Sequence, residues 1–154
     1  MKIFRTKSKA ANFWLDVILI TAILAGLCFI FFWPIRVAGS SMSPAINMGD
    51  QLIISRFSGF LGNFGRGDIV LARIEADGGT ETVIKRIAAV PGEHLIIEEG
   101  GININIILGD DEFFLLGDNL DISSDSRHFG PVSGRQIVAK ILLRYFPLSV
   151  IEIF

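Results

Sequence analysis

The chain has 154 residues, of which 51% are hydrophobic, with a mean hydropathy of +0.54 and a formal net charge of −2. This length predicts one domain, the hydropathy is typical of a membrane protein, and the charge argues against a nucleic-acid-binding surface. A single cysteine, Cys28, excludes an internal disulfide, and two distant histidines, His94 and His128, provide no zinc ligand set. We therefore expect neither a metal nor a cofactor.

The N-terminal segment predicts a membrane anchor. The 17 residues 17–33 carry no charge, and together with the apolar residues 13–15 they approach the roughly 20 residues that span a bilayer. Trp14 and Trp33 stand at its two ends, as interfacial aromatic residues do. Four basic residues precede the segment, at positions 2, 5, 7 and 9, and only Arg36 follows it closely, so the N-terminus is expected in the cytoplasm.

Two other interpretations of this segment stay open. It could be a cleaved signal peptide, although an apolar core of that kind normally has about 7–15 residues. It could also be a buried core helix of a soluble protein. With an anchor, the chain divides into a cytoplasmic N-terminus and span, residues 1–34, and an extracytoplasmic domain, residues 35–154.

The remaining chain is expected to be mostly β-structure. Short runs rich in Ile, Val and Leu alternate with Gly, Asp and Asn, the pattern of strands and turns. We predict a strongly bent, antiparallel, barrel-like sheet with strands at Gln51–Ser55, Asp68–Ile74, Thr82–Val90, His94–Ile97, Ile102–Leu108, Glu112–Leu116 and Gln136–Tyr145.

Two apolar segments interrupt this pattern. Residues 56–64 are expected to form a Gly-rich loop that carries three phenylalanines, and the C-terminal run 141–154 is similarly apolar. A loop rarely exposes three phenylalanines to water. Each segment therefore either covers the core or dips into the bilayer beside the anchor.

Three segments carry candidate chemistry. Ser41 follows a Gly/Ser turn directly after the span, where an exposed serine could act as a nucleophile with backbone amides nearby. Lys85 lies in an apolar strand, and burial would lower its pKa toward that of a neutral base, with Arg86 on the opposite face. The loop 117–131 gathers Asp118, Asp121, Asp125 and Arg127, which suggests an ion-paired network; its spacing lacks the closing Glu of an EF-hand.

These segments resemble, in order, the motifs of the bacterial type I signal peptidases. SSMSP at 40–44 looks like the Ser-Met-x-Pro box, and GDQLIISRF at 49–57 like the Gly-Asp box. RGDIVLAR at 66–73 matches the next strand of the pattern, and IKRIAAVPGE at 84–93 resembles the lysine box. GDNLDISSDSRHFGPV at 117–132 is similar to the final box, so the resemblance covers essentially the whole chain.

The resemblance implies a role for each matching residue. Ser41 would be the nucleophile and supply an oxyanion donor from its backbone N–H, Lys85 the general base, and Ser123 the hydroxyl that orients the amine. Asp118, Asp125 and Arg127 would form a structural network beside the site. Substrate would bind as an added strand along two edges and a small pocket, built from Ile35, Val37, Met42, Ile46, Val83 and Ile84.

Three departures from the family pattern stand out. Leu120 and Ile122 replace residues that are commonly Arg and Asn, which is expected to weaken the polar network. Gly39 stands where some members use a serine as the second oxyanion donor. Only 24 residues separate Gly92 from Gly117, an interval in which larger members carry a second domain.

The resemblance implies that the chain would remove signal peptides from exported preproteins after small residues at −1 and −3. It would work in the bacterial cytoplasmic membrane, with the preprotein and the lipid bilayer as partners and no nucleic acid. Two other functions fit the same features. One is a dedicated Ser/Lys processing peptidase, such as a pilin-maturing peptidase of a conjugation system, and the other is a non-catalytic, membrane-anchored β-domain. The oligomeric state is left open.

Overall fold

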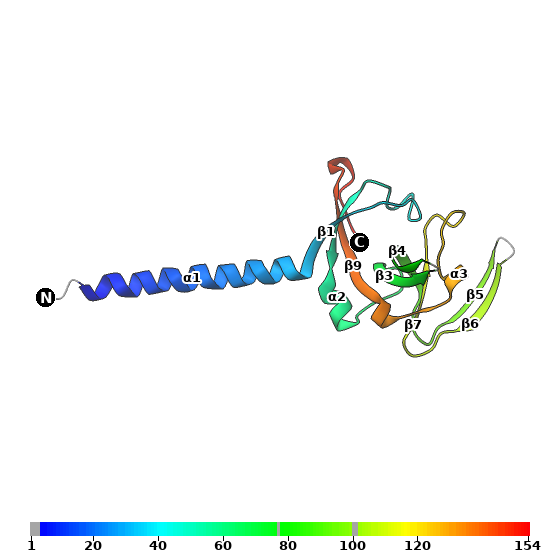
Figure 1. The fold of residues 1–154 in the computed structure, drawn as a ribbon, viewed down its shortest axis with the longest axis horizontal. Coiled ribbons are helices and arrows are strands. Elements are labelled where there is room, and N and C mark those ends of the chain that lie inside the picture. The colour runs from blue at the N-terminus through cyan, green and yellow to red at the C-terminus, as the bar shows by residue number, and fades with distance from the viewer. Residues whose placement is uncertain (1–3, 77, 100–101) are drawn as a thin grey trace.

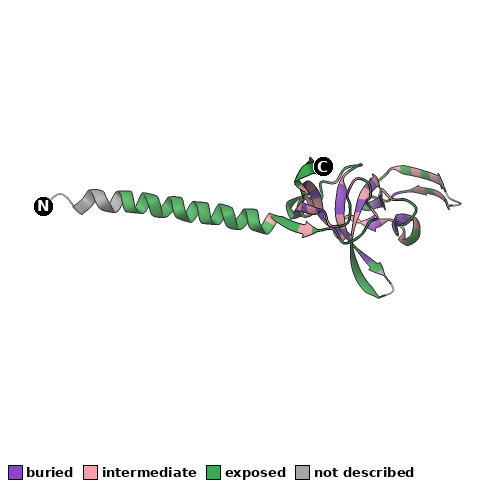
Figure 2. Ribbon diagram, turned by 90° about the horizontal axis from the view of Figure 1, so that it is seen from above, coloured by how far each residue is buried: buried purple, intermediate pink, exposed green. Residues whose placement is uncertain are grey.

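A computed structural model describes residues 4–76, 78–99 and 102–154. The chain begins with a single long helix, α1 (Phe4–Phe31), which projects from a β-rich domain (Figure 1). Its segment Ala10–Phe31 is long and apolar enough to cross a membrane, and none of it is buried within the protein. Residues 10–30 are exposed and only Phe31, at its end, is half-buried (Figure 2), so the interpretation as a buried core helix is wrong.

The helix ends before Trp33, which we had expected to close the span. Phe32–Arg36 instead forms the first strand, β1, which pairs antiparallel with β2. Pro34 explains the change, because a proline disfavours helical backbone at the residue before it and cannot donate the next helical hydrogen bond. An edge strand tolerates proline, and β1 lies at the end of the sheet. The sheet thus starts at Phe32, slightly before the predicted domain boundary.

The domain is mostly β, as predicted, and all of its strand pairs are antiparallel. The main sheet has the order β1-β2-β9-β3-β4-β7-β8, with β10 beside β9. The strands are β2 (Gln51–Ser55), β3 (Ile69–Ala76), β4 (Gly79–Ala89), β7 (Glu112–Leu116), β8 (Val132–Ser133), β9 (Ile137–Phe146) and β10 (Glu152–Ile153). Each of the seven strands expected from the pattern of apolar runs is present within a few residues of its predicted bounds.

The expectation of a barrel is wrong in one respect, because the sheet does not close. β1 and β8 end the order of strands and do not pair with each other within the described ranges. The hairpin of β5 (His94–Glu99) and β6 (Ile102–Ile107) forms a separate two-stranded sheet that projects at the end of the domain away from α1 (Figure 1).

The segment predicted as a Gly-rich loop contains a helix, α2 (Arg56–Leu61). Ser55 caps its N-terminus, with its hydroxyl accepting from the Ser58 N–H, and Gly62 ends it in left-handed backbone. Both are favoured capping residues, a signal that was present in the sequence. The other short helices are α3 (Ser126–Phe129), η1 (Gly134–Gln136) and η2 (Leu148–Val150).

Each of the two apolar segments is partly buried and partly exposed. Phe64 packs against the core, with its ring 5.9 Å from that of Phe113. The α2 side chains Phe57, Phe60 and Leu61 stay 45–82% exposed. The C-terminal run is buried or half-buried along β9 as far as Tyr145, and Phe146 is 47% exposed. Beyond β9, Leu148, Val150, Ile151 and Ile153 are 44–82% exposed.

Candidate active site

Ser41 lies in an irregular segment between β1 and β2. The base of this segment is closed by two hydrogen bonds between Val37 and the turn 49–50. Arg144 of β9 holds the far side: its Nη1 donates to the Ala45 carbonyl at 2.7 Å and to Asp50 Oδ2 at 3.1 Å. Arg144 and Asp50 are both buried, so this ion pair fixes the loop from inside the domain.

The loop that contains Asn119 contacts Ser41 on its other side. The Asn119 N–H donates to the Ser41 carbonyl at 3.0 Å, and the Asn119 side chain reaches the Ser40 carbonyl. Gly117 lies so close that a Cβ there would be 2.5 Å from the Ser41 carbonyl oxygen and nearer still to Ser123 Oγ. A glycine at this position therefore lets the serine-bearing loop and the loop with Ser123 touch.

Lys85 comes from β4 and is 2% exposed. Its Nζ lies 2.9 Å from Ser123 Oγ, which is also buried. Burial lowers the pKa of Lys85, the charge of Asp125 acts against this change, and the nearby Arg127 lowers it further. The structure thus brings together the candidate base and the candidate orienting hydroxyl. It also brings the charge of Arg127 close to Lys85, whereas Arg86 lies on the opposite face of β4, as expected.

Asp125 and Arg127 form a buried ion pair beneath the lysine. Arg127 donates to Asp125 through Nε at 2.9 Å and Nη2 at 3.0 Å. Burial alone would raise the pKa of Asp125, but hydrogen bonds from Arg127, the Gly117 N–H and Ser123 outweigh it and hold the pKa below its ordinary value. Asp125 also caps α3.

Asp118 belongs to a separate pair. Its two oxygens accept from Arg86 Nε and Nη2 at 2.8 and 2.7 Å, on the opposite face of β4 from Lys85. Asp121 is exposed, and no ion pair of Asp121 is found among the described residues. The single network expected of the four loop charges is therefore not formed: Asp125 pairs with Arg127, and Asp118 pairs with Arg86 outside the loop.

Neither histidine replaces Lys85 as a partner for Ser41. His94 lies on the projecting hairpin, where its Nε2 is 2.7 Å from Asn105 Oδ1. His128 is 55% exposed in α3, with Nδ1 beside the Asp125 backbone N–H. In the part of the chain that the structure describes, Ser41 Oγ forms no hydrogen bond with either histidine or with Lys85. Catalytic hydrogen bonds of this kind are often long until substrate is bound.

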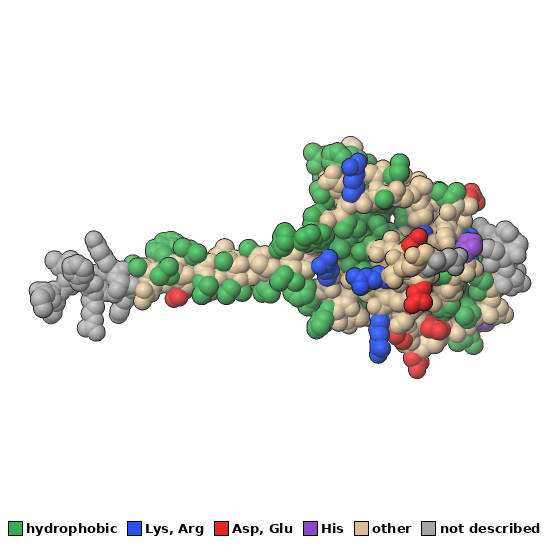
Figure 3. All heavy atoms as spheres, viewed as in Figure 1, with side chains coloured by type: hydrophobic (Ala, Val, Ile, Leu, Met, Phe, Trp, Pro, Cys, Tyr) green, Lys and Arg blue, Asp and Glu red, His purple; other side chains and the backbone are tan. Residues whose placement is uncertain are grey.

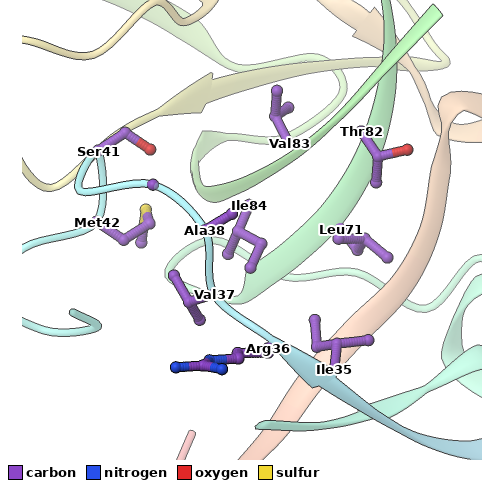
Figure 4. A pocket seen from close by; sticks show the side chains of 11 residues that line it. Ile35, Arg36, Val37, Ala38, Ser41, Met42, Leu71, Thr82, Val83 and Ile84 are labelled. Atoms are coloured by element: carbon purple, nitrogen blue, oxygen red, sulfur yellow. The ribbon is translucent and has the colours of Figure 1, made fainter. Parts of the chain in front are cut away.

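A groove of about 370 Å³ runs from β1 to Ser41 (Figure 4). Five of the six residues predicted to bind substrate line it: Ile35, Val37 and Met42, with Val83 and Ile84 of β4. Ile46 does not reach it, because its side chain is fully buried in the core behind the loop. In Figure 4 the Ser41 hydroxyl points into the space between the two lining segments.

Two sheet edges open onto this groove. β3 pairs with β4 along its length, but on the other side β7 pairs only with residues 86–89 of β4. Residues 80–85 consequently have no neighbour on that side within the described chain. β1 is likewise an edge strand. Unpaired edges of this kind accept an extended peptide as an added strand.

Comparison with known proteins identifies the family. The model of the family described as "Signal peptidase, peptidase S26" matches residues 11–110 and 106–146. The chain belongs to the signal peptidase family, S26. The projecting hairpin β5–β6 thus occupies the interval in which the resemblance places a second domain in larger members.

Three relatives illustrate the range of this family. The Mitochondrial ATP-independent inner membrane protease subunit 1a of Arabidopsis thaliana is 37% identical over 73% of this chain and 69% of its own length. Signal peptidase I P of Bacillus subtilis subsp. natto is 28% identical over 94% of this chain and 95% of its own length. Inactive signal peptidase IA of Staphylococcus aureus (strain Mu50 / ATCC 700699) is 27% identical over 85% of this chain and 91% of its own length. Since one relative is inactive, activity must be argued from this chain's own residues.

Sequence reasoning missed some residues of this S26 site. Leu71 and Thr82 also line the groove, and Leu71 pairs in register with Ile84. Strand pairing is not visible in a single sequence, so no signal marked Leu71. The departure at Leu120 also has a different consequence from the one expected: Arg127 Nη2 donates to the backbone carbonyl of Leu120 at 2.7 Å, a bond that any residue could accept.

Proposed function

We propose that this chain is a membrane-bound serine endopeptidase in which Ser41 is the nucleophile, Lys85 the general base and Ser123 the group that orients the lysine amine. The observation that carries the proposal is the burial of Lys85 against Ser123 at 2.9 Å. A lysine held away from water loses its proton more readily and can then accept one from a serine.

Acylation starts with neutral Lys85. Its Nζ takes the Ser41 hydroxyl proton as Oγ bonds to the carbonyl carbon of the scissile peptide. The tetrahedral intermediate collapses when the Lys85 ammonium returns that proton to the leaving nitrogen, and the C–N bond breaks. The mature protein leaves with a new amino terminus, and the signal peptide stays bound to Ser41 as an ester.

Deacylation repeats these proton transfers with water. Neutral Lys85 takes a proton from water as the water oxygen attacks the ester carbonyl, and the proton then passes to Ser41 Oγ as the ester bond breaks. In both steps the Ser41 N–H can donate to the oxyanion. In the described part of the chain this N–H has no acceptor of its own, which supports that assignment.

The groove supports the expected specificity. The segment 35–39 and the unpaired part of β4 would bind the signal peptide as an added strand, through main-chain hydrogen bonds that do not depend on its sequence. The lining is mainly apolar and includes Ser41, which suits small apolar residues such as alanine at −1 and −3. A shallow apolar pocket accepts alanine and excludes larger side chains by contact.

The domain, residues 35–154, would lie on the outer side of the bacterial cytoplasmic membrane. The basic residues before the span, compared with Arg36 after it, support this orientation. Protease treatment of spheroplasts tests it with a C-terminal tag: the tag should be digested without breaking the membrane. A tag that is digested only after lysis would reverse the orientation.

The bilayer would also contact the domain next to the anchor. Phe57 of α2 packs edge-on against Phe31 of α1 at 5.4 Å, and Arg56 lies over the Trp33 ring. On the face shown in Figure 3, hydrophobic side chains cover α1 and the adjoining part of the domain, whereas most acidic side chains lie farther away. This distribution suits a domain that rests on the membrane surface.

The decisive experiment is cleavage of a panel of preproteins by the full-length protein in detergent, with Ser41→Ala as the control. The wild type should release mature proteins whose new N-termini follow a small residue, and Ser41→Ala should release none while remaining folded. Cleavage of one preprotein only would indicate a dedicated processing peptidase. Undiminished cleavage by Ser41→Ala would mean that another residue is the nucleophile.

A further inference from the structure

A second groove, of about 540 Å³, lies beyond Ser41. Its apolar lining comes from the segment after the nucleophile, from β4, from the end of β7 and from the loop that carries Ser123: Pro44, Ala45, Ala88, Leu116 and Leu120. The Arg86–Asp118 ion pair forms its polar rim, with two charges that neutralise each other. None of these residues has a role in the proton transfers described above.

Gly117 and the chain after Ser41 connect the second groove with the nucleophile. The first runs from Ile35 to Ser41 and Met42, and the second begins at Pro44, two residues later. Gly117 lines the second groove and also lies against the Ser41 carbonyl and Ser123. A peptide whose acyl part fills the first groove must continue past Ser41, and the second groove lies on that side.

Leu120 makes the wall of this groove apolar. Its backbone carbonyl accepts from Arg127, while its side chain is 36% exposed and lines the apolar wall. The charged residue expected here from the family pattern would instead place a cation on that wall. An apolar wall beside a neutral ion pair favours an apolar side chain over a charged one, because a charge would lose water without gaining a partner.

We propose that the second groove binds the substrate on the mature side of the cleavage site, and that Leu120 makes it select an apolar residue within the first three positions after the scissile bond. This inference rests on the proposed function and adds a specificity determinant to it. The substrates would be preproteins whose mature sequence begins with an apolar residue near its N-terminus.

The test uses peptides that share one signal sequence and carry Gly, Leu or Asp in turn at each of the first three positions after the bond. At one of these positions, Leu should raise the kcat/KM of the detergent-solubilised protein by about tenfold over Gly or Asp. Leu120→Arg should remove this preference and favour Asp. Leu120→Ser should remove it without favouring Asp, which separates the loss of apolar contact from the gain of charge.

Ile122→Arg is the matched control, because Ile122 is 60% exposed two residues away and does not line the groove. It should keep the wild-type preference. A parallel measurement of peptide binding to Ser41→Ala, with and without Leu120→Arg, should show the same ranking in Kd. That measurement does not depend on catalysis.

The outcomes separate this inference from the proposed function. Ser41-dependent cleavage with no preference at any of the three positions, or with a preference that survives Leu120→Arg, overturns the role of the groove and leaves the peptidase assignment intact. If nothing is cleaved, the proposed function fails, and the peptide Kd values test the role of the groove. A tighter Kd for the Leu peptide that Leu120→Arg abolishes supports this role, and equal Kd values for all peptides overturn it.

Discussion

Lys85 and Ser123 lie 38 residues apart in the sequence, yet Lys85 Nζ is 2.9 Å from Ser123 Oγ. The two residues are only 2% and 3% exposed. Their contact removes the amine from water and gives it one defined direction, since a buried amine with a single hydroxyl partner cannot rotate freely. The contact therefore fixes the position of the Lys85 amine, which the proposed mechanism uses as the general base.

Activity should rise with pH as Lys85 loses its proton. Burial lowers the pKa of Lys85 from its ordinary value of 10.5, so the rise should be centred below that pH. Lys85→Arg keeps a cation that does not deprotonate, and should lose about 100- to 10,000-fold in kcat. Lys85→Met should be equally inactive and keep its thermal unfolding transition. Cleavage by Lys85→Arg at a rate close to wild type would exclude Lys85 as the base.

Ser123→Ala should reduce kcat by about 10- to 100-fold and leave KM nearly unchanged, because the amine loses its orienting partner while the substrate groove is untouched. Ser124→Ala is the matched control, since Ser124 is the exposed neighbour. Steady-state kinetics on one peptide substrate compare the two variants. Equal kcat values for both would show that Ser123 does not position Lys85.

Gly117→Ala should abolish the proposed peptidase activity without changing any ionisable group. The added Cβ would overlap Ser123 Oγ and lie 2.5 Å from the Ser41 carbonyl oxygen, so one loop must move away from the other. A displacement of about 1 Å can cost roughly 100-fold in rate. Gly65→Ala serves as a control, because its new Cβ has only an Asp68 oxygen at 3.9 Å. Wild-type kcat in Gly117→Ala would refute this close approach.

Asp125→Asn should destabilise the domain far more than Asp118→Asn. The first change leaves Arg127, with a side chain 8% exposed, facing a neutral partner, and breaking such a pair costs about 3–5 kcal/mol. The Arg86–Asp118 pair is 35% and 18% exposed, and its loss should cost about 1 kcal/mol or less. Chemical denaturation near neutral pH measures both. Similar losses of unfolding free energy in the two variants would show that burial does not make the Asp125–Arg127 pair more important for stability.

Lowering the pH should weaken the same buried pair. The folded-state pKa of Asp125 lies below its ordinary value of 3.8, so its contribution to stability is present above the pH at which the unfolded chain titrates and is lost as the pH falls through the folded-state pKa. Asp125→Asn should therefore flatten the acid limb of the stability curve compared with the wild type.

Local sequence features were sufficient to predict most of the helix and strands of this protein, and its family. The uncharged run at 17–33 predicted the long exposed helix, and Gly- and Asp-bounded runs of β-branched residues predicted the seven main strands, because backbone preference and hydrophobic pattern act over a few residues. Alternation along β4 correctly placed Lys85 and Arg86 on opposite faces. The order of short motifs pointed to the signal peptidase family.

Contacts between distant segments were decided only by the tertiary structure. The open sheet, the partition of Asp118 and Asp125 into separate ion pairs, and Arg127 as a cation near Lys85 all depend on strand order and register. Burial of Ile46 behind the loop and exposure of Leu120 in a second groove depend on them as well. A sequence specifies which residues can be buried, but their partners are set by packing across strands far apart in the chain.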